Sequence, residues 1–200
     1  MDSYIKNTLE YYDNNIDSYK DMWFNEFSKN YNFEIPDMFL SYLKNNSYIL
    51  DLGCGTGRDS KYFIDKGYKV KSIDGSKEMC NLAKNLLNIN VEQINFLDIN
   101  YENEFDGIFA CASLLHLSNE DLIIVLKKIS KSLKQNGILY TSFKYGKTNR
   151  IDSGRFYNDM TNQKFINLIS EIKELKIIKS WISDQYKSDT KFLNYILIKK

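Results

Sequence analysis

The stretch ILDLGCGTGRDS, from Ile49 to Ser60, decides the fold predicted for this chain. Three of its 9 glycines, Gly53, Gly55 and Gly57, stand at every second position directly behind a short apolar run. Glycine is favoured where the backbone adopts a positive φ or where a ligand must approach the main chain closely. The stretch therefore predicts a strand, a tight turn and the start of a helix, and it raises the question of whether a ligand sits at the turn.

Short apolar runs continue to alternate with helical segments beyond this turn. The run YKVKSID (Tyr68–Asp74) predicts a second strand, and Ser76 is a suitable N-cap for the helix that follows it. VEQINFLDI and FDGIFACAS predict a third and a fourth strand, and Ser118 followed by Asp121 predicts the start of a long helix that Gly137 closes. With GILYTSF as a fifth strand, the order indicates a mainly parallel sheet with helices on both faces.

The two ends of the chain add further elements. A helix is expected from about Thr161 to Leu175, and then KIIKSWI and FLNYILI predict two strands with no helix between them, which must pair antiparallel. At the N-terminal end, residues 2–28 predict one or two amphipathic helices, and Pro36 can open a third that runs through Leu43. The apolar positions of the first segment recur every three or four residues: Tyr4, Leu9, Tyr12, Ile16, Tyr19, Trp23 and Phe27.

These elements predict one α/β domain over residues 1–200. Its core, residues 47–200, is expected to hold a Rossmann-like, mainly parallel seven-stranded sheet that ends in an antiparallel hairpin. Residues 1–46 are expected to form an N-terminal helical extension that acts as a lid.

Composition narrows the class of protein. The chain is 43% hydrophobic and 26% charged, as in a soluble globular protein, with no apolar run long enough to span a bilayer and no secretory signal pattern. Its 3 cysteines, Cys54, Cys80 and Cys111, have no CxxC spacing, so we expect a cytoplasmic protein without a disulfide framework or a metal site. The formal net charge of +1 argues against a nucleic-acid-binding surface.

Charge is unevenly distributed along the chain. Residues 144–200 carry 12 Lys and Arg against 6 Asp and Glu. Two interpretations remain open: a solvated basic face, or an anionic substrate near the C-terminal third.

Acidic residues at the ends of the predicted strands indicate which ligand the glycine turn receives. The glycine spacing is G-x-G-x-G, and Arg58 stands where a dinucleotide-binding G-x-G-x-x-G loop has its third glycine. Asp74 ends the second strand, where a carboxylate can accept both hydroxyls of a ribose. Asp98 is expected at the end of the third strand, where it could accept from the amino group of an adenine. The pattern therefore favours a nucleoside-containing cofactor other than a nicotinamide dinucleotide.

Together, ILDLGCGTG, SIDGS, NFLDI and FDGIFACASLLHL resemble the successive motifs of class I S-adenosylmethionine-dependent methyltransferases. The resemblance covers roughly residues 48–143, and GCGTGRDS with ASLLHL is most similar to small bacterial methyltransferases of the tellurite-resistance or small-molecule type. It implies S-adenosylmethionine as cofactor, S-adenosylhomocysteine as product, and no metal.

The resemblance also implies roles for individual residues. The glycines would pass the methionine part of the cofactor with Asp51 near its ammonium, Asp74 would bind the ribose, and Asp98 with Ile99 would contact the adenine. Cys54, in the glycine loop, is interpreted as a packing residue. The full set expected at the cofactor is Asp51, Gly53, Cys54, Gly55, Gly57, Arg58, Asp74, Gly75, Ser76, Met79, Asp98, Ile99, Cys111, Ala112 and Tyr19.

Fewer residues indicate where the molecule that accepts the methyl group would bind. His116, the only histidine, follows the fourth strand and could be a general base or a hydrogen-bond partner of the substrate. The alternative is that it fixes its loop and caps the next helix. Tyr12, Tyr145 and Arg155 are further candidate substrate contacts, and Tyr11, Tyr12 and Tyr19 could face the sulfonium.

The predicted function is methyl transfer to a small-molecule acceptor, for which an anion is one candidate. DNA is disfavoured because the chain has no [DNS]-P-P-[YFW] motif, no Pro-Cys pair and no room for a target-recognition domain. Three alternatives remain open: a nicotinamide oxidoreductase, an RNA or protein methyltransferase, and a methyltransferase-like subunit that binds without catalysis. Neither a membrane partner nor a particular oligomeric state is indicated.

Overall fold

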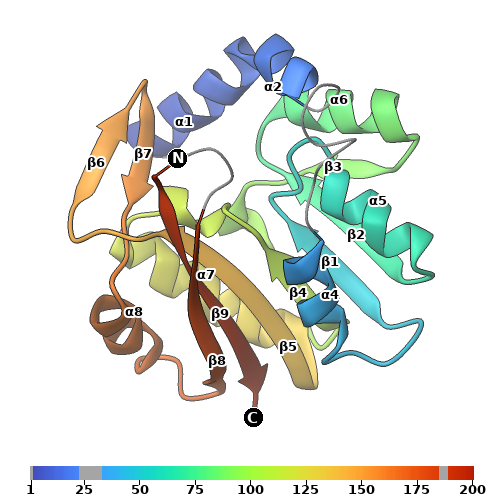
Figure 1. Ribbon diagram of the computed structural model, residues 1–200, viewed down its shortest axis with the longest axis vertical. Helices are drawn as coiled ribbons and strands as arrows, with labels where there is room; N and C mark the ends of the chain where they lie inside the picture. Colours follow the sequence, from blue (N-terminus) through green and yellow to red (C-terminus); the bar gives the residue numbers. More distant parts are fainter. Residues whose placement is uncertain (1, 23–32, 185–188) are drawn as a thin grey trace.

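A mixed sheet lies at the centre of the computed structural model, which describes residues 2–22, 33–184 and 189–200 (Figure 1). Its strands are β1 (Tyr48–Leu52), β2 (Lys69–Asp74), β3 (Val91–Gln93), β4 (Phe105–Ala110), β5 (Leu133–Lys144), β8 (Leu175–Asp184) and β9 (Lys191–Lys199). They form a 7-stranded sheet in the order β3-β2-β1-β4-β5-β9-β8. Within the described residues, β9 pairs antiparallel with both β5 and β8 and the other strand pairs of this sheet are parallel, so the predicted fold class is confirmed.

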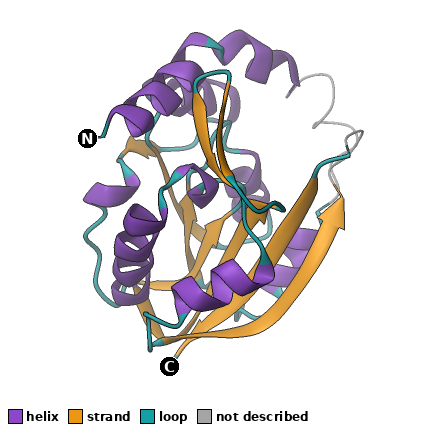
Figure 2. Ribbon diagram, turned by 90° about the vertical axis from the view of Figure 1, so that its left-hand side faces the viewer, coloured by secondary structure: helices purple, strands orange, loops and turns teal. Residues whose placement is uncertain are grey.

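The helices lie on both faces of this sheet (Figure 2). They are α1 (Ser3–Asn14), α2 (Ile16–Met22), α4 (Glu34–Leu40), α5 (Arg58–Asp65), α6 (Lys77–Leu87), α7 (Asn119–Ser132) and α8 (Asn162–Ile169). Two 3₁₀ turns, η2 (Phe96–Asp98) and η3 (Leu114–His116), follow β3 and β4. Trp23 and Phe27, which we expected on the N-terminal helices, lie outside the described residues.

Alternate residues of the buried strands supply two cores. In β1, Ile49 packs in a cluster with Phe39 of α4 and Phe63 of α5. Leu50 and Leu52 belong to a larger cluster on the opposite face, which includes residues of α7 and α8. Successive side chains of β1 point to opposite faces of the sheet. Because both faces are covered, the strand is a continuous apolar run.

Local sequence signals place several helix ends correctly. The Ser76 hydroxyl accepts from the Met79 N–H at 3.1 Å, and the Ser118 hydroxyl accepts from the Asp121 N–H at 3.1 Å. These bonds satisfy N–H groups that have no partner within the first turn of a helix. Pro36 also lies in the first turn of its helix, where its missing N–H costs little.

Three predicted boundaries are wrong. The helix that contains Pro36 ends at Leu40 and not at Leu43, and α8 ends at Ile169, well before Leu175. The long helix ends at Ser132, and β5 begins at once, before Gly137. Sheet pairing overrides helix propensity here, because Leu133 pairs with Phe105 of β4.

A second, unpredicted sheet lies between residues 144 and 162. Its two antiparallel strands are β6 (Asn149–Asp152) and β7 (Arg155–Asn158), joined at Ser153–Gly154, both with positive φ. The sequence predicts no strands in this segment, because they are only four residues long and do not alternate in polarity.

The N-terminal helices lie across the end of the molecule at which β1, β2 and β4 finish (Figure 1). The Phe156 N–H of β7 donates to the Thr8 hydroxyl at 3.1 Å, and the Ser76 hydroxyl donates to Asp13 at 2.6 Å. Helix α1 is thereby tied both to the small hairpin and to the N-terminus of α6.

Candidate active site

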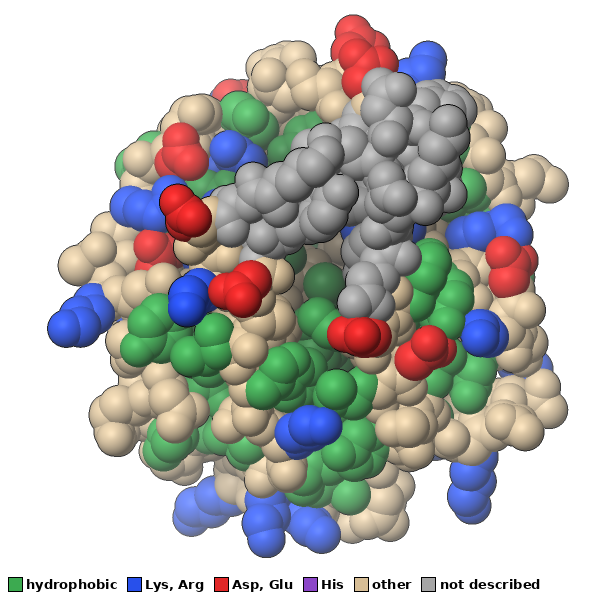
Figure 3. All heavy atoms as spheres, in the orientation of Figure 1, with side chains coloured by type: hydrophobic (Ala, Val, Ile, Leu, Met, Phe, Trp, Pro, Cys, Tyr) green, Lys and Arg blue, Asp and Glu red, His purple; other side chains and the backbone are tan. Residues whose placement is uncertain are grey.

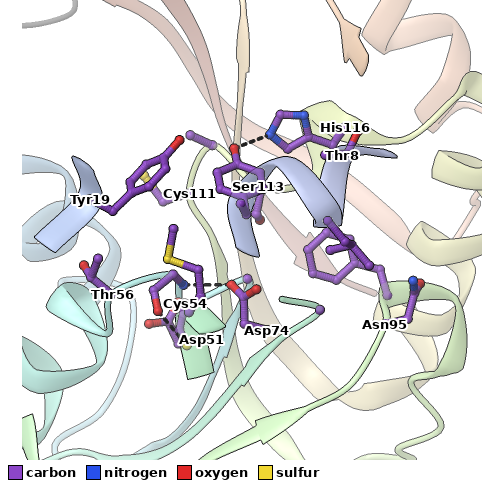
Figure 4. A pocket seen from close by; sticks show the side chains of 18 of the residues that line it. Thr8, Tyr19, Asp51, Cys54, Thr56, Asp74, Asn95, Cys111, Ser113 and His116 are labelled. Atoms are coloured by element: carbon purple, nitrogen blue, oxygen red, sulfur yellow. Dashed lines mark hydrogen bonds between the residues drawn. The ribbon is translucent and has the colours of Figure 1, made fainter. Parts of the chain in front are cut away.

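A cavity of about 270 Å³ opens at the carboxyl ends of β1, β2 and β4 (Figure 4). Ligands of parallel α/β sheets bind at this edge, and pockets for small molecules begin at roughly 300 Å³. The sequence-predicted residues that line it are Asp51, Gly53, Cys54, Gly55, Arg58, Asp74, Gly75, Met79, Cys111, Ala112, Tyr12, Tyr19 and His116. The structure thus brings most of the predicted site residues to one cavity.

The three glycines of the turn differ in what a side chain at each position would contact. Each has a positive φ, of 80°, 54° and 79° at Gly53, Gly55 and Gly57. A Cβ at Gly53 would stand 2.5 Å from the Ser113 Cβ, and one at Gly57 would stand 2.7 Å from the Ile89 Cδ1. A Cβ at Gly55 would meet nothing within 4 Å, so Gly55 is the glycine whose missing side chain leaves cavity space open.

Asp51 is a buried carboxyl group at the end of β1. The Ser60 hydroxyl donates to it at 2.6 Å, yet burial, reinforced by the nearby Asp59, raises the pKa of Asp51 to about 7. A carboxyl group in this condition gains the most from a cationic ligand, because a positive charge would offset the cost of burying its ionised form.

Asp74, at the end of β2, is held in place by the main chain. One carboxylate oxygen accepts from the Gly55 N–H and the other from the Ser76 N–H, both at 2.8 Å. Burial raises the pKa of Asp74, although these two N–H groups oppose the rise. Each carboxylate oxygen has a second lone pair, so the group can still accept two hydroxyls.

The remaining polar groups of the loop are engaged or neutral. Arg58 forms an ion pair with Asp59 through its Nη2 at 2.6 Å and its Nε at 3.1 Å. Burial raises the pKa of the Cys54 thiol well above its usual value and that of Cys111 to about 12. Neutral thiols are poor nucleophiles, which agrees with the interpretation of Cys54 as a packing residue.

The two residues expected at an adenine do not line the cavity, whereas the residues three positions earlier do. Asp98 is exposed and Ile99 is buried in the core, and neither lines the cavity; Asn95 and Phe96 do. The chain leaves the sheet after Gln93, where Asn95 starts the η2 turn by accepting from the Leu97 N–H at 3.0 Å. An Asn side chain that begins such a turn was the available signal.

Gly57 and Ser76 stand one layer behind the cavity wall. Neither lines the cavity; Gly57 begins α5 and Ser76 caps α6. Sequence reasoning missed other wall residues, above all Thr8 and Leu9 of α1 and Ser113, whose hydroxyl donates to the Leu52 carbonyl at 2.7 Å. Only the folded chain brings α1 to this edge.

At the other end of the cavity, His116 lies between two partners. Its Nδ1 is 2.7 Å from the Phe156 carbonyl oxygen, and its Nε2 is 2.7 Å from the Tyr12 hydroxyl oxygen. A carbonyl oxygen can only accept, so Nδ1 carries the hydrogen and Nε2 accepts from Tyr12. Burial lowers the pKa of His116 to about 4, so the ring is neutral near pH 7. Helix capping belongs to Ser118 and not to His116.

Tyr145 and Arg155, the two candidate substrate contacts from the basic C-terminal third of the chain, differ in their position relative to the cavity. Tyr145 is 49% exposed and lies outside the cavity wall, so the structure does not place it at the site. Arg155 of β7 also lies outside the wall, but directly behind it: its guanidinium is 4.1 Å from the Tyr11 ring centroid, and its Nη1 donates to the Tyr19 hydroxyl at 3.5 Å.

Two kinds of feature are absent from the described residues. Among residues 2–22, 33–184 and 189–200, no three His, Cys, Asp or Glu side chains are grouped so as to hold a metal ion. Within the same part of the chain, no helix has the length and apolar character needed to cross a membrane.

Comparison with known proteins agrees with this geometry. Residues 49–137 match the family model described as a methyltransferase domain. An uncharacterized methyltransferase of Staphylococcus carnosus (strain TM300) is 30% identical over 153 residues, which cover 71% of this chain and 72% of that protein.

Solved structures share the fold at lower identity. The Burkholderia thailandensis 1,6-didemethyltoxoflavin-N1-methyltransferase, with bound 1,6-didemethyltoxoflavin and S-adenosylhomocysteine, has a TM-score of 0.80 at 20% identity, covering 98% of this chain and 89% of that one. A TehB-like S-adenosylmethionine-dependent methyltransferase from Corynebacterium glutamicum has a TM-score of 0.73 at 19% identity, covering 92% and 97%. With a glycine turn between two carboxylates at the edge of this sheet, the chain belongs to the class I S-adenosylmethionine-dependent methyltransferases.

Proposed function

We propose that this enzyme transfers the methyl group of S-adenosylmethionine to a small-molecule acceptor. The observation that carries the proposal is that Asp51 and Asp74 open on one cavity, on either side of the glycine turn. A carboxyl group suited to an ammonium and a carboxylate suited to a diol stand together there, as the two polar ends of the cofactor require.

The residues of the cofactor end fit S-adenosylmethionine. Asp51 would receive its ammonium, Asp74 its ribose hydroxyls, and Gly55 would leave room for the methionine chain. Asn95 and Phe96, in place of Asp98 and Ile99, would border the adenine. Gly75, Met79, Cys111 and Ala112 would complete the apolar wall.

The cofactor supplies an electrophilic methyl carbon, so the protein must chiefly place the acceptor in line with it. A new bond forms between the acceptor atom and the methyl carbon, while the carbon–sulfur bond breaks and its electron pair stays on sulfur. We assign His116 a positioning role: it accepts from the Tyr12 hydroxyl and thereby fixes Tyr12 in the cavity wall.

A small acceptor is favoured by the covering of the cavity. Residues of α1 and α2 line it, and we propose that residues 1–46 act as a lid on the core, residues 47–200, within one domain. On the face shown in Figure 3, Asp and Glu of the described residues lie beside Lys and Arg in the upper part, and Lys and Arg groups lie among uncharged side chains along the lower edge. The neighbour in fold from Burkholderia thailandensis has 1,6-didemethyltoxoflavin bound, which supports a small-molecule acceptor. The cysteine usage keeps the cytoplasm as the proposed location.

Calorimetric titration tests the cofactor. S-Adenosylmethionine and S-adenosylhomocysteine should each bind at micromolar concentrations, and NADH, as control, should not. If neither sulfur compound binds, the proposal is wrong. If both bind, release of S-adenosylhomocysteine in the presence of small molecules, RNA or peptides distinguishes the acceptor classes, and the absence of turnover with all three would favour a binding subunit.

A further inference from the structure

The end of the cavity lined by Tyr12, Tyr19 and His116 is called the acceptor end here, because it would hold the molecule that accepts the methyl group. The direction of the hydrogen bonds made by His116 at this end is fixed. The Phe156 carbonyl must accept from His116 Nδ1, so His116 Nε2 must accept from the Tyr12 hydroxyl. The Nε2 lone pair, which a general base would need, therefore already accepts the Tyr12 hydroxyl proton.

The Tyr19 hydroxyl differs from that of Tyr12, because it accepts a hydrogen bond from the protein. Arg155 Nη1 donates to its hydroxyl oxygen at 3.5 Å, which leaves the Tyr19 O–H proton available to the cavity that Tyr19 lines. Behind it, Arg155 Nε is buried and has no hydrogen-bond partner among the described residues. At this end the Tyr19 O–H therefore faces the cavity as a donor, with the Arg155 guanidinium behind it.

Positive charge is in excess around these donors. Lys144, Arg150 and Arg155 surround the Tyr157 ring, with their charged groups 4.1, 4.4 and 5.3 Å from its centroid. Two carboxylates stand against them: Asp159 pairs with Arg150 at 2.9 Å, and the half-exposed Asp152 approaches Arg155 only to 3.9 Å. These three cations therefore outnumber the two carboxylates, and the ion pair of Arg155 with Asp152 is long, at 3.9 Å.

We propose that the acceptor enters as an organic anion, already deprotonated, that the Tyr19 hydroxyl binds its carboxylate-type oxygens, and that the Arg155 guanidinium behind Tyr19 supplies the positive charge. This inference rests on the proposed function and names the substrate class and the specificity-determining pair of the same site. An oxygen anion only accepts hydrogen bonds, so it matches the Tyr19 O–H donor and the positive charge behind it. It also neutralises the guanidinium beside a cofactor whose sulfonium is itself positive.

The test is binding to the protein saturated with S-adenosylhomocysteine, with benzoate and its neutral isostere benzamide as probes. Calorimetry should show benzoate binding at least tenfold more tightly than benzamide. Arg155→Gln should abolish that preference, while Lys147→Gln, which removes one exposed charge from the same segment, should keep it. Arg155→Gln should still bind S-adenosylhomocysteine with wild-type affinity.

If Arg155→Gln does not fold, Tyr19→Phe serves in its place, because it removes only the hydroxyl, and it should weaken benzoate binding several-fold without changing benzamide binding. Equal affinity for the two probes, or no benzoate binding while S-adenosylhomocysteine binds, overturns the inference. Failure of S-adenosylhomocysteine to bind the wild type would instead be a failure of the proposed function, and the two results are distinguishable.

Discussion

The two ends of the cavity are built in different ways. The cofactor end comes from consecutive strand ends and the loops that follow them: Asp51, the glycine turn and Asp74 lie within 24 residues of sequence. The acceptor end is assembled from distant segments, with Tyr12 of α1 bonded to His116, and His116 bonded to Phe156 of β7.

This difference decides how each end tolerates change. At the cofactor end, main-chain N–H groups hold the functional carboxylate, so a substitution acts on the ligand directly. At the acceptor end, side chains hold one another, so a substitution changes the position of a neighbour first. We therefore expect large effects on cofactor binding at one end and smaller, indirect effects at the other.

The largest effect is expected for Asp74→Ala. It removes the proposed acceptor of two ribose hydroxyls, each hydrogen bond to a charged group being worth about 1.5–3 kcal/mol, so the affinity for S-adenosylhomocysteine should fall about 100-fold or more. Calorimetry measures the change, and thermal unfolding verifies the fold. Asp74→Asn, which keeps the shape, should lose affinity too; wild-type affinity in either variant would remove Asp74 from the site.

Gly55→Ala should weaken S-adenosylhomocysteine binding about tenfold or more, because its Cβ would occupy open cavity space. Gly67→Ala is the matched control: Gly67 also has a positive φ, of 87°, and a Cβ there would also meet nothing within 4 Å. Both variants should lose about 1–2 kcal/mol of unfolding free energy through the left-handed backbone, as chemical denaturation can measure. Equal loss of binding in both would show that strain, and not cavity space, is responsible.

The affinity for S-adenosylhomocysteine should rise about tenfold between pH 6 and pH 8. Below the Asp51 pKa of about 7, the carboxyl group holds a proton that must leave before it can pair with an ammonium; above it, this cost disappears. Titrations across this range measure the change. Asp51→Asn should bind more weakly and with a flat profile, and a pH dependence that survives this substitution would assign it to another group.

Smaller effects are expected at the acceptor end. Once an acceptor is identified, Tyr12→Phe and His116→Gln should each lower kcat less than tenfold, because His116 positions Tyr12. With S-adenosylmethionine saturating at every pH, so that Asp51 does not contribute, the wild-type kcat should show no inflection near 6.5, since the pKa of His116 is about 4. A general base contributes ~10²–10⁴-fold, so a loss in that range with a matching inflection would restore the base role.

The smallest effect is expected for Asp98→Ala. Asp98 is exposed and outside the cavity wall, so the affinity for S-adenosylhomocysteine should stay within about twofold of wild type, inside the ±0.5 kcal/mol usual for surface substitutions. Asn95→Ala, measured in the same titration, should weaken binding more. The reverse order would return the adenine contact to Asp98.

The sequence by itself determined the fold class, the glycine turn and the two carboxylates, because each depends on short-range rules. Residues Tyr48–Leu52 alternate between two covered faces, Ser76 and Ser118 cap the helices that follow them, and a strand end places Asp74 at the edge of the sheet. These signals are contained in a few neighbouring residues.

Only the tertiary structure decided the rest. The hairpin β6–β7 has short strands without alternation, and it is held by α1 and η3 through Thr8 and His116. Asp98 turns outward because Asn95 starts a 3₁₀ turn that ends the strand early. The polarity of the acceptor end depends on a carbonyl oxygen 40 residues from His116 in sequence, and no local pattern encodes a contact made by such distant parts of the chain.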